Sequence, residues 1–369
     1  MPNPDFDRAM MRRCLELAKQ ARGYTAPNPM VGAVVVQHGE VVGEGFHPKA
    51  GEPHAEVFAL RAAGDRAEGA TVYVNLEPCN HYGRTPPCSK TLVEAGVSRV
   101  VVGMVDPNPK VAGGGIATLE AAGIAVTVGV EAAACQQLNE AFVYRMEHRR
   151  PLGILKYAMT LDGKIAATTG HSAWVTTPDS RRVVHEVRAG VDAVIVGGNT
   201  VRRDNPQLTS HGAGHNPLRV VMSRSLDLPL EAHLWNVTDV PTLVFTVAGT
   251  QPTVQDKLRS HGVEVVELPE LTPALAIAHL YGRGCLSVLW ECGGTLAARA
   301  IADGCVQKVM AFVAPKIIGG AMAPSPVGDL GFAKMTDALQ LEQVSWRSVA
   351  TDLLIEGYLH QPTWKTDAE

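Results

Sequence analysis

Four residues in the first quarter of the chain combine metal-binding and proton-transfer chemistry. They are His54 and Glu56, with one residue between them, and Cys79 and Cys88, with eight residues between them. Imidazole and thiolate are ligands that zinc prefers, and a catalytic zinc site keeps one position open for water. Zinc lowers the pKa of such a water towards about 7, which makes hydroxide available at neutral pH. The four residues therefore predict a hydrolytic zinc site.

Glu56 indicates which hydrolysis this site performs. A carboxylate beside a zinc ligand, at the start of an expected helix, can take a proton from water and pass it to a leaving group. A His-x-Glu motif combined with Pro-Cys is typical of zinc deaminases, and Pro78 precedes Cys79 in this chain. We predict hydrolytic deamination, with His54, Cys79 and Cys88 as zinc ligands and Glu56 as the catalytic proton shuttle.

Two simpler interpretations of the four residues stay open. The cysteines and His54 could be ordinary core residues, or the zinc could be structural. A structural zinc usually has four protein ligands and would leave Glu56 without a role. The positions favour catalysis, because Cys88 follows two prolines at an expected helix start, where thiolates are stabilised. Glu77 lies at the carboxyl end of a strand, where open α/β sheets bind ligands.

The elements that must position these residues alternate between strand and helix. Apolar spacing predicts a first helix that ends near Gly23, and a turn at His38-Gly39 separates two strands. The expected strands are 31–36, 41–45, 71–76, 99–105 and 124–128, and the other expected helices are 54–63, 86–95, 116–122 and 132–146. This order predicts an α/β sandwich with a largely parallel sheet.

A second domain is expected from residue 150, which divides the chain of 369 residues into 1–149 and 150–369. Pro151 follows a charged helix and precedes a new apolar strand. The expected strands are 152–159, 192–196, 218–222, 242–247, 263–268 and 287–290, and the expected helices are 177–189, 272–281 and 295–302. A β-rich segment after Lys308 ends in an expected hairpin at 341–359, which would give a parallel sheet an antiparallel edge.

Composition excludes several classes of protein. A net charge of −4 without a basic stripe argues against nucleic-acid binding. Seven scattered cysteines argue against a disulfide framework. No apolar run approaches the roughly 18 residues of a membrane span, and the polar first residues do not resemble a signal peptide. We expect a cytoplasmic enzyme with a small-molecule substrate and no membrane or nucleic-acid partner.

Longer motifs surround the zinc residues: NPMVG at 28–32, GEPHAE at 51–56, LEPCNHYGRTPPC at 76–88 and DPNPKVAG at 106–113. With them, the chain resembles the bifunctional bacterial riboflavin-biosynthesis enzymes, which join a pyrimidine deaminase to a pyrimidine reductase. The resemblance extends from about residue 7 to residue 359. The eight residues between Cys79 and Cys88 are its most specific feature, because tRNA and cytidine deaminases have two.

The resemblance implies a cytidine-deaminase-like α/β/α sandwich in the first domain. The implied substrate is a diaminopyrimidinone that carries a ribosylamino 5′-phosphate. The residues implied to contact its base and phosphate arm are Asn28, His47, His81 and Arg84. An amide can bind a pyrimidine edge, and a guanidinium or imidazolium suits a phosphate. Each of these residues could instead be an ordinary turn or loop residue.

The second half has four further motifs: KYAMTLDGK at 156–164, SAW at 172–174, VGGNTVRRDNPQLT at 196–209 and ECGGTL at 291–296. They resemble the reductase of the same family, which implies a dihydrofolate-reductase-like α/β domain and reduction of the ribosylamino group by NADPH. Glycine pairs at 197–198 and 293–294 would let the backbone approach a phosphate, and the helix that starts at Thr295 would attract it. Either turn alone could be only a turn.

The resemblance also implies which residues form the reductase site. The residues implied for NADPH are Ala158, Trp174, Thr200, Asp204, Gly293, Gly294, Thr295, Leu296 and Ala297, and those implied for the substrate are Lys156, Ser172, Arg188, Leu208 and Glu291. Trp174 could instead be a core residue. A buried strand end rarely carries a carboxylate without a purpose, which favours a role for Glu291.

The chain departs from the family at two places. Ser210-His211 stands where members often have Val-Arg, and Ser223-Arg224 stands where many have Asp followed by Ser or Thr. These changes put the substrate contacts of residues 210–224 in doubt. Arg224 could instead contact the 2′-phosphate of NADPH.

Two other functions stay open. A nucleic-acid deaminase is disfavoured by the acidic composition, the long spacing between the cysteines and the second domain. A non-catalytic C-terminal dimerisation domain is conceivable because of the departure at His211. The family resemblance implies a homo-oligomer, either a dimer or a tetramer.

Overall fold

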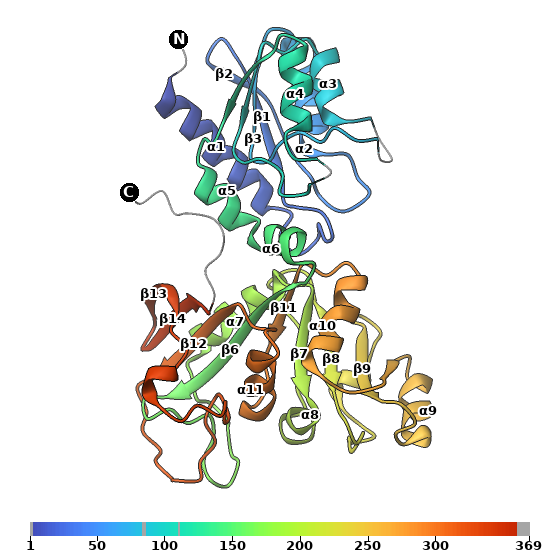
Figure 1. The fold of residues 1–369 in the computed structure, drawn as a ribbon, viewed down its shortest axis with the longest axis vertical. Coiled ribbons are helices and arrows are strands. Elements are labelled where there is room, and N and C mark those ends of the chain that lie inside the picture. Colours follow the sequence, from blue (N-terminus) through green and yellow to red (C-terminus); the bar gives the residue numbers. More distant parts are fainter. Residues whose placement is uncertain (1–2, 83–85, 110, 360–369) are drawn as a thin grey trace. The chain divides into compact units, whose positions relative to one another are not determined.

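The computed structural model describes residues 3–82, 86–109 and 111–359. The chain forms two compact units, and the boundary between them falls between Arg149 and Arg150 (Figure 1). Each unit is built on one mixed sheet with helices. All seven cysteines are free thiols. Within the described ranges, no helix combines the length and apolarity that a bilayer span requires.

The first unit contains a five-stranded sheet in the order β2-β1-β3-β4-β5. Its strands are β1 (Gly32–Gln37), β2 (Glu40–Phe46), β3 (Thr71–Val74), β4 (Arg99–Val102) and β5 (Ala125–Val128). Strand β1 is antiparallel to β2 and β3, whereas β3, β4 and β5 are parallel. Strands β2, β3, β4 and β5 therefore run in one direction, which confirms the prediction of a largely parallel sheet, and only β1 is reversed. The cause is the turn at His38 and Gly39, both with positive φ. So short a connection can join only antiparallel strands.

The helices described in this unit are α1 (Pro4–Lys19), α2 (Ala55–Ala63), α3 (Cys88–Glu94), α4 (Gly114–Ala121), α5 (Ala132–Leu138) and α6 (Glu140–His148), with a short 3₁₀ helix at Gly64–Ala67. The first helix ends at Lys19, before the predicted end near Gly23. The predicted helix at 132–146 is interrupted at Asn139, whose side chain binds the backbone of Met30. Its Oδ1 accepts from Met30 N at 2.8 Å, and its Nδ2 donates to Met30 O at 3.0 Å.

Helix α2 packs directly on strand β2 because two glycines leave room for it. A Cβ atom on Gly43 would lie 2.2 Å from Ala59 O, and one on Gly45 would lie 2.7 Å from Ala55 O. Ala59 is also part of the buried core of this unit, together with Val72 of β3. The close contact fixes the start of α2, which carries the His-x-Glu motif.

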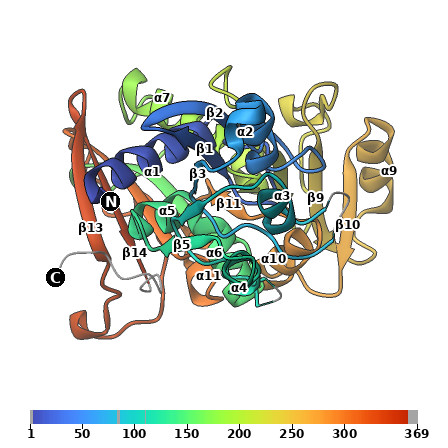
Figure 2. The same cartoon turned by 90° about the horizontal axis from the view of Figure 1, so that it is seen from above.

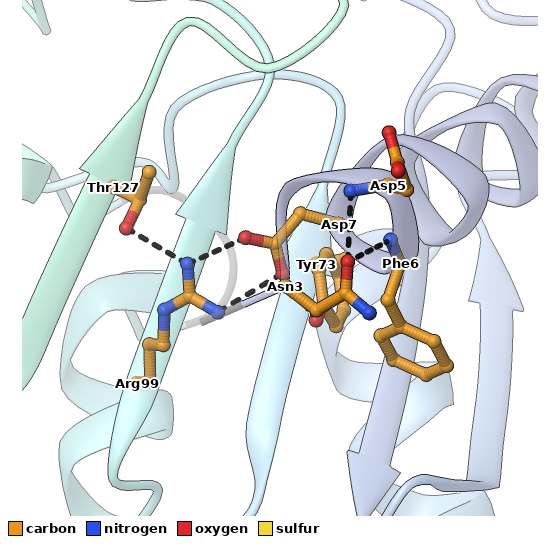
Figure 3. Close-up of polar contacts among 7 residues, drawn as sticks. All are labelled: Asn3, Asp5, Phe6, Asp7, Tyr73, Arg99 and Thr127. Atoms are coloured by element: carbon orange, nitrogen blue, oxygen red, sulfur yellow. Dashed lines mark hydrogen bonds and ion pairs between the residues drawn. The ribbon is translucent and has the colours of Figure 1, made fainter. Parts of the chain in front are cut away.

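A buried ion pair joins α1 to the sheet (Figure 3). Asp7 accepts from Arg99 Nη1 at 3.0 Å and Nη2 at 2.7 Å, and from Tyr73 Oη at 2.7 Å. Arg99 Nη2 also donates to Thr127 Oγ1 at 3.0 Å. Burial alone would raise the pKa of Asp7, but the hydrogen bonds from Arg99 and Tyr73 lower it. The cluster therefore connects α1 to β3, β4 and β5 through an ionised carboxylate.

The Asp7→Asn substitution is expected to destabilise the first unit by about 2–3 kcal/mol at pH 7, because it leaves Arg99 without its counter-charge. Since the pKa of Asp7 is lowered on folding, its contribution is present above the ordinary value of 3.8 and is lost as pH falls through the folded pKa. Denaturant unfolding of both proteins at pH 7 and pH 3 measures this. An equal difference at the two pH values would contradict the assignment.

The second unit contains a nine-stranded sheet in the order β10-β9-β8-β7-β11-β6-β12-β14-β13. Its strands are β6 (Leu152–Thr160), β7 (Ala193–Gly197), β8 (Leu218–Met222), β9 (Thr242–Val247), β10 (Glu264–Leu268), β11 (Ser287–Trp290), β12 (Lys308–Ala314), β13 (Glu342–Val349) and β14 (Asp352–Tyr358). In this sheet order, all strands from β10 through β9, β8, β7, β11 and β6 to β12 are parallel. Strands β14 and β13 add an antiparallel edge, as predicted. Figure 2 shows this hairpin and β10 at opposite ends of the sheet.

The helices described in this unit are α7 (Pro178–Ala189), α8 (Gly198–Asp204), α9 (Pro252–Ser260), α10 (Pro273–Gly282) and α11 (Gly294–Ala302), with 3₁₀ helices at His233–Trp235 and Met335–Asp337. Helices α8 and α9 were not predicted. Strands β7 and β11 are parallel neighbours, and α8 and α11 directly follow them. Both helices therefore begin at the carboxyl edge of the sheet.

Candidate active sites

The three predicted zinc ligands converge from the ends of three elements. His54 is the N-cap of α2, Cys88 is the first residue of α3, and Cys79 lies in the segment that leaves β3. His54 Nδ1 lies 3.2 Å from Cys88 Sγ and 3.5 Å from Cys79 Sγ, and all three ligand atoms lie within 4.8 Å of one another. Zinc bonds of about 2.0–2.3 Å in tetrahedral geometry place ligand atoms about 3.5–3.8 Å apart. These side chains therefore fit a zinc ion.

The surroundings of Cys79 favour the thiolate that zinc binds. The hydrogen bond from the Cys88 thiol lowers the pKa of Cys79, against the effect of burial, and the same hydrogen bond raises the pKa of Cys88. The backbone N–H of Cys88 also donates to Cys79 Sγ at 3.3 Å. A ligand that is already deprotonated releases no proton when metal binds.

Glu56 lies in the first turn of α2 and is buried. Burial raises the pKa of its carboxyl group, and the charge of His54 opposes this effect. Glu56 is also close enough to hydrogen-bond with the Cys88 side chain. A buried carboxyl group beside the ligand set, with a pKa shifted towards neutrality, suits proton transfer in both directions.

Asn28 and His47 lie beside the ligand set. Asn28 Nδ2 is 3.1 Å from His47 Nε2, and the His47 ring is 5.4 Å from the His54 ring. Burial lowers the pKa of His47, which favours neutral imidazole. Its Nδ1 is 3.0 Å from Pro53 O and can donate to it. His47 Nε2 then accepts a hydrogen bond from Asn28 Nδ2. This leaves the side-chain oxygen of Asn28 able to accept a hydrogen bond from another group.

Of the two residues implied for the phosphate arm, the structure describes only His81. His81 is exposed on the segment after Cys79, near enough for its charge to lower the pKa of Asp106. Burial has the larger effect and raises the pKa of Asp106 to about 6. Arg84 lies outside the described residues.

Sequence reasoning missed two asparagines that hold the loop carrying Asn28. Besides Asn139, Asn75 binds this loop, since its Nδ2 donates to Met30 O at 3.0 Å and its Oδ1 accepts from Gly32 N at 2.8 Å. A fully buried asparagine at the end of a buried strand was the signal that could have revealed Asn75.

In the second unit, three of the residues implied for the substrate form a partly buried charge cluster. Glu291 follows β11 and accepts from Arg188 Nε at 2.6 Å and Nη2 at 3.0 Å, and Lys156 Nζ on β6 lies 3.7 Å from Glu291 Oε2. Burial opposes ionisation, but the charges of Arg188 and Lys156 lower the pKa of Glu291 to about 2. Arg188 Nη1 also donates to Thr209 O at 3.0 Å, which brings the neighbouring Leu208 near the cluster.

The residues implied for NADPH gather around two adjacent helix N-termini. Gly197 is the N-cap of α8 and Gly293 is the N-cap of α11, and a Cβ atom on Gly197 would lie 3.5 Å from the Leu296 side chain. Thr200 and Asp204 belong to α8, while Gly294, Thr295, Leu296 and Ala297 begin α11. Unpaired N–H groups at helix starts bind phosphate.

The remaining implied residues lie at the edges of this region. Ala158 is on β6, and Ser172 Oγ donates to Asp204 Oδ1 at 3.4 Å rather than joining the charge cluster. Trp174 is 70% exposed, so the alternative that it is a core residue was wrong. The Arg181 guanidinium lies 4.4 Å from the Trp174 ring centre.

At the first departure from the family, His211 packs against another imidazole. Its ring centre lies 4.3 Å from that of His185 on α7. Burial lowers the pKa of both, that of His185 to about 4. Ser210 folds the same loop by donating from its backbone N–H to Asn216 Oδ1 at 2.8 Å.

Comparison with known proteins identifies the family. The family model for the cytidine and deoxycytidylate deaminase zinc-binding region matches residues 4–104, and that for the RibD C-terminal domain matches residues 151–355. The chain is 61% identical over 354 residues to the riboflavin biosynthesis protein RibD of Synechocystis sp., covering 96% of each chain. The chain belongs to the RibD family.

Solved RibD structures agree with this assignment. Acinetobacter baumannii RibD is 37% identical with a TM-score of 0.88, covering 97% of this chain and 100% of that one. The Thermotoga maritima deaminase/reductase is 35% identical with a TM-score of 0.86, covering 96% and 99%. The protein is thus a bifunctional enzyme of riboflavin biosynthesis, a zinc-dependent deaminase and NADPH-dependent reductase. A nucleic-acid deaminase and a non-catalytic C-terminal half are not favoured.

The Glu291→Gln substitution is expected to destabilise the second unit by about 3 kcal/mol, because it leaves Arg188 and Lys156 as partly buried cations without a counter-charge. NADPH oxidation should be lost while ammonia release is retained. Denaturant unfolding and the two activity assays measure this. Glu264→Gln is the matched control, because it breaks an exposed pair with Arg283 and should cost less than about 1 kcal/mol. Equal losses in the two variants would contradict the charge-cluster interpretation.

Proposed function

We propose that residues 1–149 form the deaminase and residues 150–369 form the reductase. The deaminase releases ammonia from 2,5-diamino-6-ribosylamino-4(3H)-pyrimidinone 5′-phosphate. The reductase then converts the ribosylamino product to 5-amino-6-ribitylamino-uracil 5′-phosphate. The observation that carries the first assignment is the convergence of His54, Cys79 and Cys88 around one point beside the buried Glu56.

In the deaminase, His54, Cys79 and Cys88 hold the zinc, and Glu56 moves the proton. Water adds to the ring carbon that bears the amino group, Glu56 carries the proton from water to the amino nitrogen, and ammonia leaves. Asn28 binds the pyrimidine edge, because its Nδ2 is committed to His47 and its oxygen is left to accept from a ring N–H. His81 and Arg84 bind the phosphate arm.

In the reductase, NADPH supplies the hydride and the chain orients the reactants. The N-termini of α8 and α11 bind the cofactor phosphates, with Ala158, Trp174, Thr200, Asp204 and residues 293–297 around it. Lys156, Arg188, Leu208 and Glu291 face the substrate, and Ser172 joins them from the side of Asp204. Because the pKa of Glu291 is about 2, its carboxylate accepts hydrogen bonds from the sugar and donates none.

We also propose a cytoplasmic enzyme that forms a dimer or tetramer through the reductase. Support for the assembly comes from the outermost strand β13, where Trp346 is 71% exposed and Val344 is also exposed. A contact between copies would cover these side chains.

The Glu56→Ala substitution should reduce ammonia release by about 10²–10⁴-fold, because the proton shuttle is lost. Zinc content should stay at the wild-type level, and NADPH oxidation should persist when deaminated substrate is supplied. In the wild-type enzyme, ammonia release should proceed without NADPH, whereas NADPH oxidation should require prior deamination. Retention of ammonia release in the variant would refute the role of Glu56.

The Arg224→Ala substitution should raise the KM for NADPH about tenfold and leave the KM for NADH unchanged, because a guanidinium–phosphate hydrogen bond is lost. Arg224 is exposed just beyond β8 and has no ion-pair partner in the described part of the chain. Its neighbour Ser223 lies against the start of α8, where a Cβ atom on Gly198 would be 2.9 Å from Ser223 Oγ. Steady-state kinetics with NADPH and NADH tests this role of Arg224, and an unchanged KM for NADPH would contradict it.

A further inference from the structure

Glu77 is a buried carboxylate two residues before Cys79, and it is only 3% exposed. It forms no ion pair with any residue in the described ranges. Instead, Glu77 accepts four backbone N–H groups. Oε2 accepts from Asp106 at 3.2 Å and Gly113 at 3.0 Å, and Oε1 accepts from Gly115 at 2.9 Å and Ile116 at 3.2 Å.

These four N–H groups belong to the loop after β4 and to the start of α4. The N–H groups of a first helical turn have no partner within the helix, and the helix dipole favours a negative charge there. Glu77 therefore accepts hydrogen bonds from the unpaired N–H groups at the N-terminus of α4 and from N–H groups of the loop that leads into it. This set of donors stabilises a buried carboxylate.

The segment that carries Cys79 is pressed against α4 at the same place. A Cβ atom on Gly115 would lie 1.9 Å from Pro78 O, so only glycine allows this approach. Glu77 N also donates to Met104 O at 2.9 Å. The backbone on the N-terminal side of Cys79 is thereby fixed.

Asn80 fixes the other side of Cys79. Its Oδ1 accepts from Ser89 Oγ on α3 and from Thr118 Oγ1 on α4, each at 3.0 Å. Ser89 N donates in turn to Cys79 O at 3.2 Å. Cys79 is therefore held between an anchor at Glu77 and an anchor at Asn80, next to the helix that begins with Cys88.

We propose that Glu77 is a positioning residue for the zinc centre, because its carboxylate holds the Cys79 thiolate at the distance where it completes the ligand set with His54 and Cys88. The inference rests on the proposed ligand assignment. Groups that orient ligands usually change metal affinity by about 10–100-fold when they are lost. A glutamine would keep the shape of Glu77 but set its NH₂ group against backbone N–H donors, so charge and acceptor count matter together.

The experiment compares zinc affinity in full-length variants, measured by competition with a chromogenic chelator. Glu77→Gln is expected to bind zinc about 10–100-fold more weakly than the wild-type chain. Cobalt(II) added in place of zinc should show an altered visible absorption spectrum, which reports ligand geometry without catalysis. Turnover of deaminated substrate by the reductase should be unchanged and serves as the internal control for folding of the second unit.

Asp7→Asn is the matched control within the first unit. Asp7 is also a buried carboxylate, but it contacts Arg99 and Tyr73 rather than the segment that carries Cys79 (Figure 3). This variant should lose stability and keep the zinc affinity of the wild-type chain. An equal loss of zinc affinity in both variants would mean that Glu77→Gln acts by destabilising the whole first unit, and this result would overturn the proposal.

Two further variants separate the possible failures. If Cys79→Ser keeps wild-type zinc affinity, the ligand assignment itself fails. If Cys79→Ser loses zinc and Glu77→Gln does not, only the role of Glu77 fails. Should Glu77→Gln not fold, Asn80→Ala loosens the other anchor of the same segment, and unchanged zinc affinity in that variant also overturns the proposal.

Discussion

Unpaired backbone N–H groups at helix starts are the constraint on which both active sites depend. The first turn of a helix leaves these donors without intrahelical partners, and parallel strands direct successive helices to begin at one sheet edge. In the first unit, His54 and Cys88 stand at the starts of α2 and α3, and Glu77 accepts from the start of α4. In the second unit, α8 and α11 begin side by side. The same geometric rule thus supplies the N–H donors that hold Glu77 in one half and, as we propose, the edge that binds the cofactor phosphates in the other.

Two glutamates illustrate how the surroundings of a side chain decide its use. Burial raises the pKa of Glu56, and no arginine or lysine forms an ion pair with it in the described part of the chain, so its carboxyl group can exchange a proton. Glu291 is partly buried, and Arg188 and Lys156 keep it ionised. The same residue type is therefore suited to proton transfer in the hydrolytic half and to fixed negative charge in the reductive half.

The sequence predicted what depends on residue type and local pattern. The cluster of His54, Cys79 and Cys88 could be predicted because thiolate and imidazole are metal-binding groups. A helix start close to Cys88 could be predicted because two prolines precede it, although the helix begins two residues later than expected. The β13–β14 hairpin and the antiparallel edge also followed from local alternation.

The remaining features depend on contacts distant in sequence. The residues of a strand do not specify which strands it pairs with. The position of β1 between β2 and β3, antiparallel to both, was therefore not predicted. Apolar periodicity continues through Asn139, and only its hydrogen bonds to Met30 explain the break between α5 and α6. The anchoring role of Glu77 depends on four donors from the loop after β4 and the start of α4, and the nearest of them lies 29 residues away in sequence.

The break at Asn139 also bears on how much chain a deaminase of this kind needs. The match to the zinc-binding region ends at residue 104, yet the loop that carries Asn28 is closed by a side chain 109 residues after Met30. Asn139, between the last two helices of the first unit, thus holds the loop that carries Asn28, so these helices are more than a spacer before residue 150. A fragment cut to the length of the family match would keep every proposed metal ligand and lose the hydrogen bonds that Asn139 makes to the loop carrying Asn28.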